Sequence, residues 1–415
     1  MPLTPSCSGA KLVPVMGGHV NHIERSSRWS LDRRGVLRAL AGALAGPALL
    51  RAQQDSFRDH SRIPALSEMR TVFDFEPVAF ATLPRQVYDF TSYGADGEFT
   101  LRRNREAFDW VDLVPQGVVD PAAVSTSSEL LGMKLEYPIM VAPSAAHLAL
   151  HADGEMGTHV GCTAAANTVL ISSHVASMPI GKITAAAKGP VWYQLYPRRA
   201  LDYNRKVLDE AQAVGCQAVV VTVDQQASSF ERRLHDRNLL GPTGRGPSAP
   251  AAPPRNPYGV ADDRLWYQWK LFDDLRPYVK VPMLVKGIVT GEDAAMCVEH
   301  GLDGIYVSNH GGRSVDYEPS TLEVLPEIVD AVDGAMPVIV DSGFRRGSDI
   351  LKALALGASA VCVSRPQRWG LAAYGAPGVQ RVLEILQAEL RLAMASTGQT
   401  SLGLIDERLV RTYFP

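Results

Sequence analysis

Residues 307–316, VSNHGGRSVD, place a histidine and an arginine three positions apart at the end of an apolar run. Imidazole titrates near neutral pH, so His310 is suited to accept a proton as a general base. A guanidinium can hold a carboxylate through two parallel hydrogen bonds, so Arg313 is suited to bind an acid. The pair therefore predicts a site that holds a carboxylic acid and removes a proton from it.

Three polar residues that lie in or after other apolar runs would complete such a site. Asp224 could orient the His310 imidazole and stabilise the imidazolium that forms when it takes a proton. Tyr196 could hydrogen-bond a substrate hydroxyl. Lys286 is a cation within a buried run, so it requires an anionic partner there.

A phosphate site is indicated by two segments that follow the last apolar runs, DSGFRRGSD (341–349) and SRP (364–366). Arg345, Arg365 and the backbone amides at a helix start would hold the anion. A phosphate-bearing cofactor beside a base and a carboxylate-binding arginine suggests the oxidation of a hydroxy acid.

The elements that position these residues are short apolar runs alternating with helical stretches. Runs without polar alternation are typical of strands buried on both faces, and strand–helix alternation predicts a parallel sheet. Eight such units fit a (β/α)8 TIM barrel, with a doubly wound open sheet as the alternative. The runs are YPIMVAP (137–143), VLISS (169–173), VWYQLY (191–196), AVVVTVD (218–224), PMLVKG (282–287), GIYVSN (304–309), PVIVDSG (337–343) and AVCVSR (360–365).

Each of the runs ends in, or is followed by, polar residues, and in a TIM barrel the carboxyl ends of the strands carry the chemistry. For one residue, hydrogen bonding at a strand end would explain this equally well, but a purely structural barrel would not need all of them. The set is Ser144, Ser172, Ser173, His174, Gln194, Tyr196, Thr222, Asp224, Lys286, His310, Arg313, Asp341, Ser364 and Arg365.

Four segments organise the chain. Residues 1–54 predict a lead and a twin-arginine export signal, because Arg33 and Arg34 precede an apolar stretch of roughly 15 residues, too short for a typical membrane span. An amphipathic surface helix is the alternative there. We expect an N-terminal helical segment over 55–130 and the barrel over 131–405. The Pro- and Gly-rich stretch 239–263, after the fourth strand, predicts a flexible lid loop.

Composition narrows the class of protein. The 415-residue chain is 46% hydrophobic, which is enough for a large core, and its net charge is −3. That charge gives no reason to expect nucleic acid as a partner. The five cysteines include no CxxC pair and are interpreted as buried thiols. His147 and His151 have HxxxH spacing, but no third ligand follows, so we expect no metal site.

Together these stretches resemble the FMN-dependent L-2-hydroxy-acid oxidases and dehydrogenases, which include glycolate oxidase, lactate oxidase and the flavin domain of flavocytochrome b2. The resemblance covers residues 64 to 405. The matching stretches, in the same order and spacing, are FEPVAFATLPRQVYDF, PIMVAPSA, YQLY, TVD, LVKG, VSNHGGRSVDY, DSGFRRGSDILKALALGA and SRP.

The resemblance implies FMN across the barrel mouth, with His310 as the base, Asp224 orienting it, and Arg313 and Tyr196 holding the substrate. Arg232 resembles a second arginine near the carboxylate. Lys286 would stabilise the reduced flavin, and hydride and carbanion routes both stay open. The residues implied to bind FMN are Ala142, Pro143, Ser144, Ser172, Gln194, Thr222, Lys286, Ser308, Asp341, Gly343, Arg345, Ser364 and Arg365.

Three positions depart from the family pattern. Phe90 stands where the family has a tyrosine whose hydroxyl binds the substrate carboxylate, His174 replaces an aromatic residue, and Ser364 replaces a glycine. An altered substrate with an apolar side chain is therefore expected.

The family resemblance also bears on electron transfer and assembly. We expect electrons to pass to oxygen or to a respiratory acceptor, and a homotetramer. The alternatives are a monooxygenase that decarboxylates the keto acid, against which Ala145 weighs, and a flavin-binding electron carrier.

Overall fold

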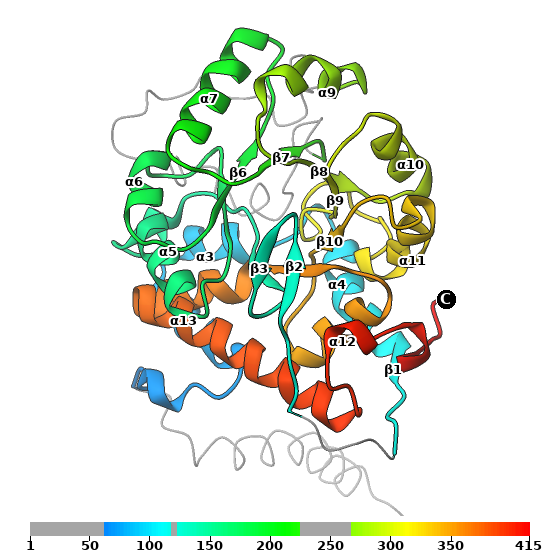
Figure 1. Ribbon diagram of the computed structural model, residues 1–415. Helices are drawn as coiled ribbons and strands as arrows, with labels where there is room; N and C mark the ends of the chain where they lie inside the picture. The colour runs from blue at the N-terminus through cyan, green and yellow to red at the C-terminus, as the bar shows by residue number, and fades with distance from the viewer. Residues whose placement is uncertain (1–61, 118–122, 225–266) are drawn as a thin grey trace, which may run out of the picture. The chain divides into compact units, whose positions relative to one another are not determined.

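Eight parallel strands close into a barrel within the compact unit Pro64–Pro415 (Figure 1). They pair in chain order, and the last strand pairs back with the first through Val361 and Ile139. The predicted TIM barrel is confirmed, and closure excludes the open sheet. The strands are β4 (Ile139–Val141), β5 (Leu170–Ser173), β6 (Val191–Leu195), β7 (Val219–Thr222), β8 (Met283–Ile288), β9 (Gly304–Val307), β10 (Val338–Val340) and β11 (Ala360–Val363).

The computed structural model describes residues 62–117, 123–224 and 267–415. Three features expected from the sequence lie outside the described residues: the export segment 1–54, the loop 239–263 and Arg232. Within the described part of the chain, no helix is long and apolar enough to cross a bilayer.

Helices surround the barrel and connect its strands (Figure 1). The last of them is bent, because Tyr374 and Gly375 depart from helical backbone angles and Gly375 has a φ of 62°. The helices are α5 (Gly154–Ala164), α6 (Ile180–Ala185), α7 (Leu201–Ala213), α9 (Lys270–Leu275), α10 (Gly291–Glu299), α11 (Thr321–Val332), α12 (Gly347–Ala355) and α13 (Arg365–Ser396). Single 3-10 turns are η1 (Leu66–Glu68), η2 (Val72–Asp74), η3 (Ala107–Trp110), η4 (His147–Ala149), η6 (Arg276–Tyr278), η7 (Leu402–Leu404) and η8 (Glu407–Leu409).

The segment before the barrel is mostly helical, but it also contains short strands that the sequence analysis did not predict. Unlike the barrel strands, these short strands have a charged residue at their centre, so no continuous apolar run marks them in the sequence. The helices are α2 (Phe75–Thr82), α3 (Arg85–Ser92) and α4 (Phe99–Glu106). The strands are β1 (Val111–Leu113), which pairs with β12 (Val410–Thr412), and the hairpin β2 (Ser128–Leu130) and β3 (Met133–Leu135).

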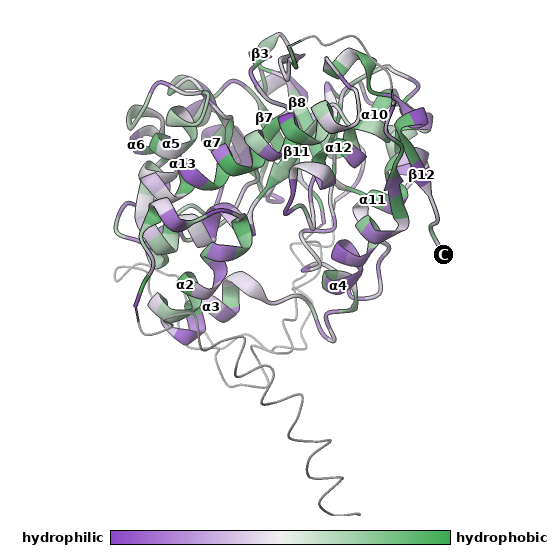
Figure 2. Cartoon of the chain, turned by 90° about the horizontal axis from the view of Figure 1, so that it is seen from below, coloured by the Kyte–Doolittle hydropathy of each residue, from purple (hydrophilic) through white to green (hydrophobic). Residues whose placement is uncertain are grey.

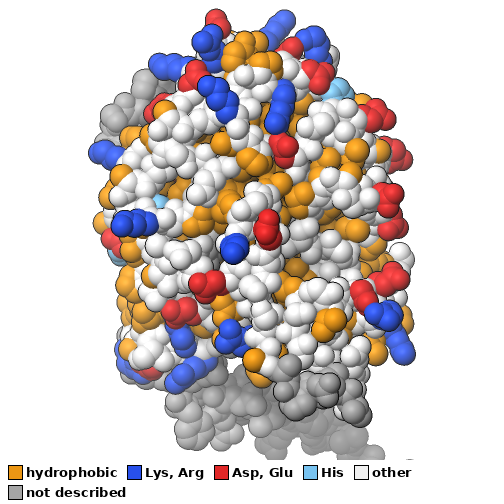
Figure 3. Space-filling view, in the orientation of Figure 1, with side chains coloured by type: hydrophobic (Ala, Val, Ile, Leu, Met, Phe, Trp, Pro, Cys, Tyr) orange, Lys and Arg blue, Asp and Glu red, His pale blue; other side chains and the backbone are white. Residues whose placement is uncertain are grey.

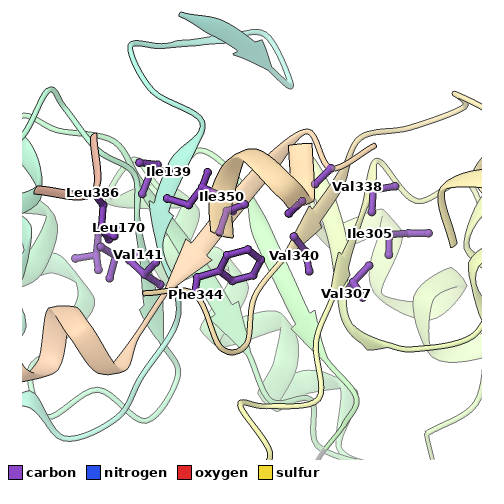
Figure 4. Close-up of a cluster of buried hydrophobic side chains, with 14 of the residues drawn as sticks. Ile139, Val141, Leu170, Ile305, Val307, Val338, Val340, Phe344, Ile350 and Leu386 are labelled. Carbon is purple, nitrogen blue, oxygen red and sulfur yellow. The ribbon is translucent and has the colours of Figure 1, made fainter. Parts of the chain in front are cut away.

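Alternate residues of the barrel strands pack on opposite faces, as strand geometry requires. Ile139 and Val141 of β4 face outward and pack in the same cluster as Ile350 of α12 and Leu386 of α13 (Figure 4). Met140, between them, belongs to the separate cluster that fills the barrel. The strands are therefore buried on both faces, which explains their continuous hydrophobicity.

The hairpin β2–β3 closes the amino-terminal end of the barrel. Leu130 and Leu135 pack into the interior cluster, and the Trp192 indole N–H lies 3.3 Å from the Met133 sulfur. Figure 2 shows β3 at one end of the barrel and α3 and α4 at the other. The carboxyl ends of the strands therefore face the α3–α4 side.

The described cysteines are buried and free: Cys162, Cys216, Cys297 and Cys362.

On the face seen in Figure 3, acidic and basic side chains are interspersed and form no patch of one sign.

Candidate active site

The interior of the barrel changes from apolar to polar at the carboxyl ends of the strands. Trp192, Val220 and Leu284 belong to the interior cluster. Because side chains two positions apart share a face, the next inward positions of these strands bring three polar groups to one level. They are Gln194, Thr222 and Lys286, all buried.

Lys286 forms a hydrogen-bonded cluster with Asp224 and His310, which follow the ends of β7 and β9. One carboxylate oxygen of Asp224 lies 2.8 Å from His310 Nδ1, and the other accepts from Lys286 Nζ at 2.9 Å. The carboxylate is the anionic partner that the sequence required for Lys286. Tyr196 Oη lies 3.4 Å from His310 Nε2.

The protonation states follow from burial and from these contacts. Burial alone raises the pKa of Asp224, but His310 and Lys286 outweigh it and hold the pKa at about 2. Burial lowers the pKa of His310 below its ordinary 6.5, helped by Lys286 and opposed by Asp224. The neutral imidazole therefore keeps its proton on Nδ1, donated to Asp224, and leaves Nε2 as an acceptor.

A sharp turn after β9 presents His310. His310, Gly311 and Gly312 all have left-handed backbone angles, with φ between 57° and 74°. A side chain at Gly312 would come within 2.7 Å of the Leu101 backbone nitrogen in α4, so this position requires glycine. The His310 N–H donates to Ser308 Oγ at 3.0 Å, which fixes the start of the turn.

Two arginines bind the carboxyl end of α3 across the barrel mouth. Arg313 Nη1 donates to the carbonyls of Phe90 at 2.8 Å and Tyr93 at 2.7 Å. Its guanidinium carbon also lies 5.0 Å from the centre of the Phe90 ring. Arg365 donates to the carbonyls of Thr91, Tyr93 and Gly311. Cations stabilise the negative, carboxyl-terminal end of a helix. The two arginines therefore hold α3 at the barrel mouth and place Phe90 of this helix beside Arg313.

Three neighbouring strands carry buried polar atoms that have no hydrogen-bond partner within the described part of the chain. They are Ser172 Oγ on β5, Gln194 Nε2 on β6 and Thr222 Oγ1 on β7. Buried polar groups are almost always paired, so a row of orphans on adjacent strands indicates a ligand that supplies the partners. The row continues to Lys286 on β8, and it fits a flat ring with donors and acceptors along one edge.

The opposite side of the mouth presents the predicted phosphate-binding residues. Arg345 is buried, donates to the Phe344 carbonyl at 2.8 Å and lies 4.9 Å from the Trp369 ring. Burial, aided by Arg105, lowers its pKa to about 10. A guanidinium buried in this way is stabilised by an anion. Arg365 begins α13, whose N-terminal amides add further donors.

The remaining predicted residues lie on the same rim. Asp341 accepts from Ser342 Oγ at 2.8 Å, and a side chain at Gly343 would overlap the Asn104 carbonyl. The Ala142 amide extends the β4 ladder by donating to Val363. Ser364 precedes α13, and Pro143 follows β4.

Two buried residues beside the site were not predicted as site residues, and one of them, His147, was considered only as a metal ligand. His147 contacts Ser144 Oγ at 2.7 Å and Thr158 Oγ1 at 2.9 Å, so both ring nitrogens have protein partners. Arg368 donates to the Ala145 carbonyl at 2.6 Å. The sequence does not show whether an arginine inside a helical stretch faces the site or the solvent, because packing decides which way its side chain points.

Residues 79–412 match the family of FMN-dependent dehydrogenases. The chain belongs to this family. The resemblance drawn from the motifs is thereby confirmed, and FMN is the cofactor. The row from Ser172 to Lys286 fits its ring, and the buried Arg345 fits its phosphate.

Known proteins are similar to this family member over more than four fifths of the chain. Human 2-hydroxyacid oxidase 1 is 38% identical over 362 residues, which cover 83% of this chain and 97% of the relative. A peroxisomal (S)-2-hydroxyacid oxidase of Arabidopsis thaliana is 36% identical, covering 84% and 98%. The crystal structure of mandelate oxidase superposes with a TM-score of 0.75 at 34% identity, covering 83% and 99%.

Proposed function

We propose that this FMN-dependent enzyme oxidises an L-2-hydroxy acid to the 2-keto acid, with His310 as the base. The observation that carries the proposal is the Asp224–His310 contact of 2.8 Å, through which a neutral imidazole donates from Nδ1 and keeps Nε2 as an acceptor. The relatives named as 2-hydroxyacid oxidases support the substrate class.

The roles of the protein's own groups follow from the geometry. His310 Nε2 takes a proton from the substrate, and Asp224 stabilises the imidazolium. Tyr196 hydrogen-bonds the substrate hydroxyl, and Arg313 binds the carboxylate. FMN, when bound, supplies the acceptor for the two electrons that the substrate loses. The loss of two electrons and two protons converts the hydroxy acid into the keto acid.

The residues proposed to hold FMN divide into a ring group and a phosphate group. The ring group comprises Ala142, Pro143, Ser144, Ser172, Gln194, Thr222, Lys286 and Ser308. The phosphate group comprises Asp341, Gly343, Arg345, Ser364 and Arg365.

An anaerobic titration of the purified, flavin-loaded protein with L-2-hydroxy acids from small to aromatic tests the proposal. One class of acid should bleach the oxidised-flavin absorbance and yield the matching keto acid. A protein that holds FMN and is bleached by none of them would refute the hydroxy-acid assignment and favour an electron carrier.

Phe90→Tyr should tighten the binding of small hydroxy acids. The new hydroxyl would lie beside Arg313, whose guanidinium already faces the Phe90 ring. A hydrogen bond to a charged group is worth about 1.5–3 kcal/mol, so we expect a KM roughly 10- to 100-fold lower for glycolate or lactate. Steady-state kinetics measure this, with Phe80→Tyr as the remote control. An unchanged KM would show that the Phe90 ring does not face the substrate carboxylate.

The electron acceptor is proposed to be oxygen or a respiratory carrier. Peroxide formed in equal amount with the keto acid would support oxygen, and reduction of a quinone or dye without peroxide would support a carrier. A shortened acid without peroxide would instead indicate a decarboxylating monooxygenase.

A tetramer is proposed by family resemblance alone, and light scattering of the holoprotein tests it.

Export to the periplasm or the medium is proposed from the pair Arg33–Arg34 and the apolar stretch after it. The twin-arginine route carries folded, cofactor-loaded proteins, which suits a flavoprotein. Fractionation of cells that express the full chain tests this. Replacing both arginines with lysine should retain the flavoprotein in the cytoplasm, and equal distribution of the two forms would contradict export.

A further inference from the structure

Arg368, in the first turn of α13, is a buried cation that the reaction described above does not use. The residue is 4% exposed. Nη1 donates to the Ala145 carbonyl at 2.6 Å, and Nη2 donates to Thr91 Oγ1 at 3.0 Å. Both partners are neutral. No carboxylate of the described residues forms an ion pair with this guanidinium.

The acidic group that acts electrostatically on Arg368 has other hydrogen-bond partners. Glu155 attracts Arg368 electrostatically, but its carboxylate accepts from the Ser177 hydroxyl at 2.8 Å and from the His147 amide at 3.1 Å. Burial, together with the charge of Arg313, lowers the pKa of Arg368 to about 9. An anion bound beside Arg368 and Arg313 would offset the cost of burying these two positive charges.

Three guanidiniums converge on the carboxyl end of α3. Arg313 binds the carbonyls of Phe90 and Tyr93, Arg365 binds that of Thr91, and Arg368 binds the Thr91 side chain. A helix end offers only about half a negative charge, which does not neutralise Arg368, whose contact there is with the Thr91 hydroxyl. Arg365 belongs to the proposed phosphate group, whereas Arg368 interacts with Arg313 and with the loop after β4. An anion for Arg368 is therefore expected at the substrate end of the mouth.

We infer that Arg368 is a further carboxylate-binding residue of the active site, acting beside Arg313. The inference rests on the proposed function, since it assigns a further contact to the same substrate. The bound carboxylate has two possible sources. It is the carboxylate of the 2-hydroxy acid itself, for which Phe90 offers no hydroxyl, or the second carboxylate of a 2-hydroxy diacid.

Arg368→Leu and Arg368→Lys test the inference, with Arg103→Leu as the matched control. Arg103 is a partly buried guanidinium whose partner, Glu323 at 2.6 Å, lies within the chain. The first measurement is the dissociation constant of oxalate, read from the perturbation of the flavin spectrum. Removing a charge-assisted contact should weaken binding roughly 10- to 100-fold in Arg368→Leu. Arg368→Lys should recover part of the loss, and Arg103→Leu should bind as the wild type does.

The second measurement separates the two sources of the carboxylate. KM and kcat for flavin reduction are compared between a 2-hydroxy monoacid and L-malate. Equal rises in KM for both acids indicate the acid's own carboxylate, and a rise confined to L-malate indicates a diacid substrate. In either case kcat should stay within about threefold of the wild-type value, because a contact made equally in the ground state and the transition state affects KM and not kcat.

Unchanged oxalate binding and KM in flavin-loaded Arg368→Leu or Arg368→Lys would overturn the inference and leave Arg368 a packing residue. That outcome leaves the proposed function intact, because the wild type would still be reduced by its acid. Failure of the proposed function would appear instead as a wild type that no hydroxy acid bleaches.

Discussion

His310→Ala should slow flavin reduction by about 10²- to 10⁴-fold at saturating substrate, because it removes the base that takes the substrate's proton. The loss should appear mainly in the rate of bleaching, measured by anaerobic stopped flow, because Arg313 remains to bind the acid. The variant should retain FMN, because it leaves unchanged the buried Arg345 and the unpaired polar groups proposed to bind the ring, which are Ser172, Gln194 and Thr222. Reduction within tenfold of the wild-type rate would exclude His310 as the base.

The pH profile is the internal control for this variant. Burial places the pKa of His310 below its ordinary 6.5, and the neutral imidazole is the reactive form. Wild-type kcat/KM should therefore be retained at pH 7 and be lost as the pH falls through a midpoint below 6.5. His310→Ala should lack this acid limb, and an unchanged limb would assign it to another group.

Asp224→Asn should affect both activity and stability. The change leaves Lys286, whose side chain is 3% exposed, without the carboxylate at 2.9 Å. Breaking a buried ion pair by removing one partner costs about 3–5 kcal/mol. The amide can also donate to His310 Nδ1, which moves the ring proton to Nε2 and blocks the base. The rate of flavin reduction should fall by roughly 10³- to 10⁴-fold, following the same tautomer logic as in serine proteases.

The double variant Asp224→Asn with Lys286→Met separates the two effects. Replacing the cation with an apolar side chain removes the unpaired charge, so the free energy of unfolding, measured with denaturant at saturating FMN, should recover. The rate of flavin reduction should stay low, because the His310 ring proton remains on Nε2 in the double variant. Recovery of the rate together with stability would show that Asp224 acts only by neutralising Lys286.

The eight barrel strands were predictable because both of their faces are buried, which leaves an unbroken apolar run for each. The polar residues at their ends were predictable as a group for a related reason: the interior of a parallel barrel can turn polar only where the strands end. The short strands outside the barrel escaped prediction. Strand β1 exists only because Val111 finds Thr412 about 300 residues later.

The sequence by itself determined the barrel, the polar rim and the residue types suited to acid binding and proton removal. Only the tertiary structure decided which of them meet. Lys286 reaches Asp224 because Thr222 and Lys286 are in register on adjacent strands. Arg313 reaches Phe90, and Arg368 reaches Thr91, because α3 packs against the mouth. Local patterns report burial and backbone preference, whereas contacts across more than 200 residues depend on barrel closure and on where α3 docks.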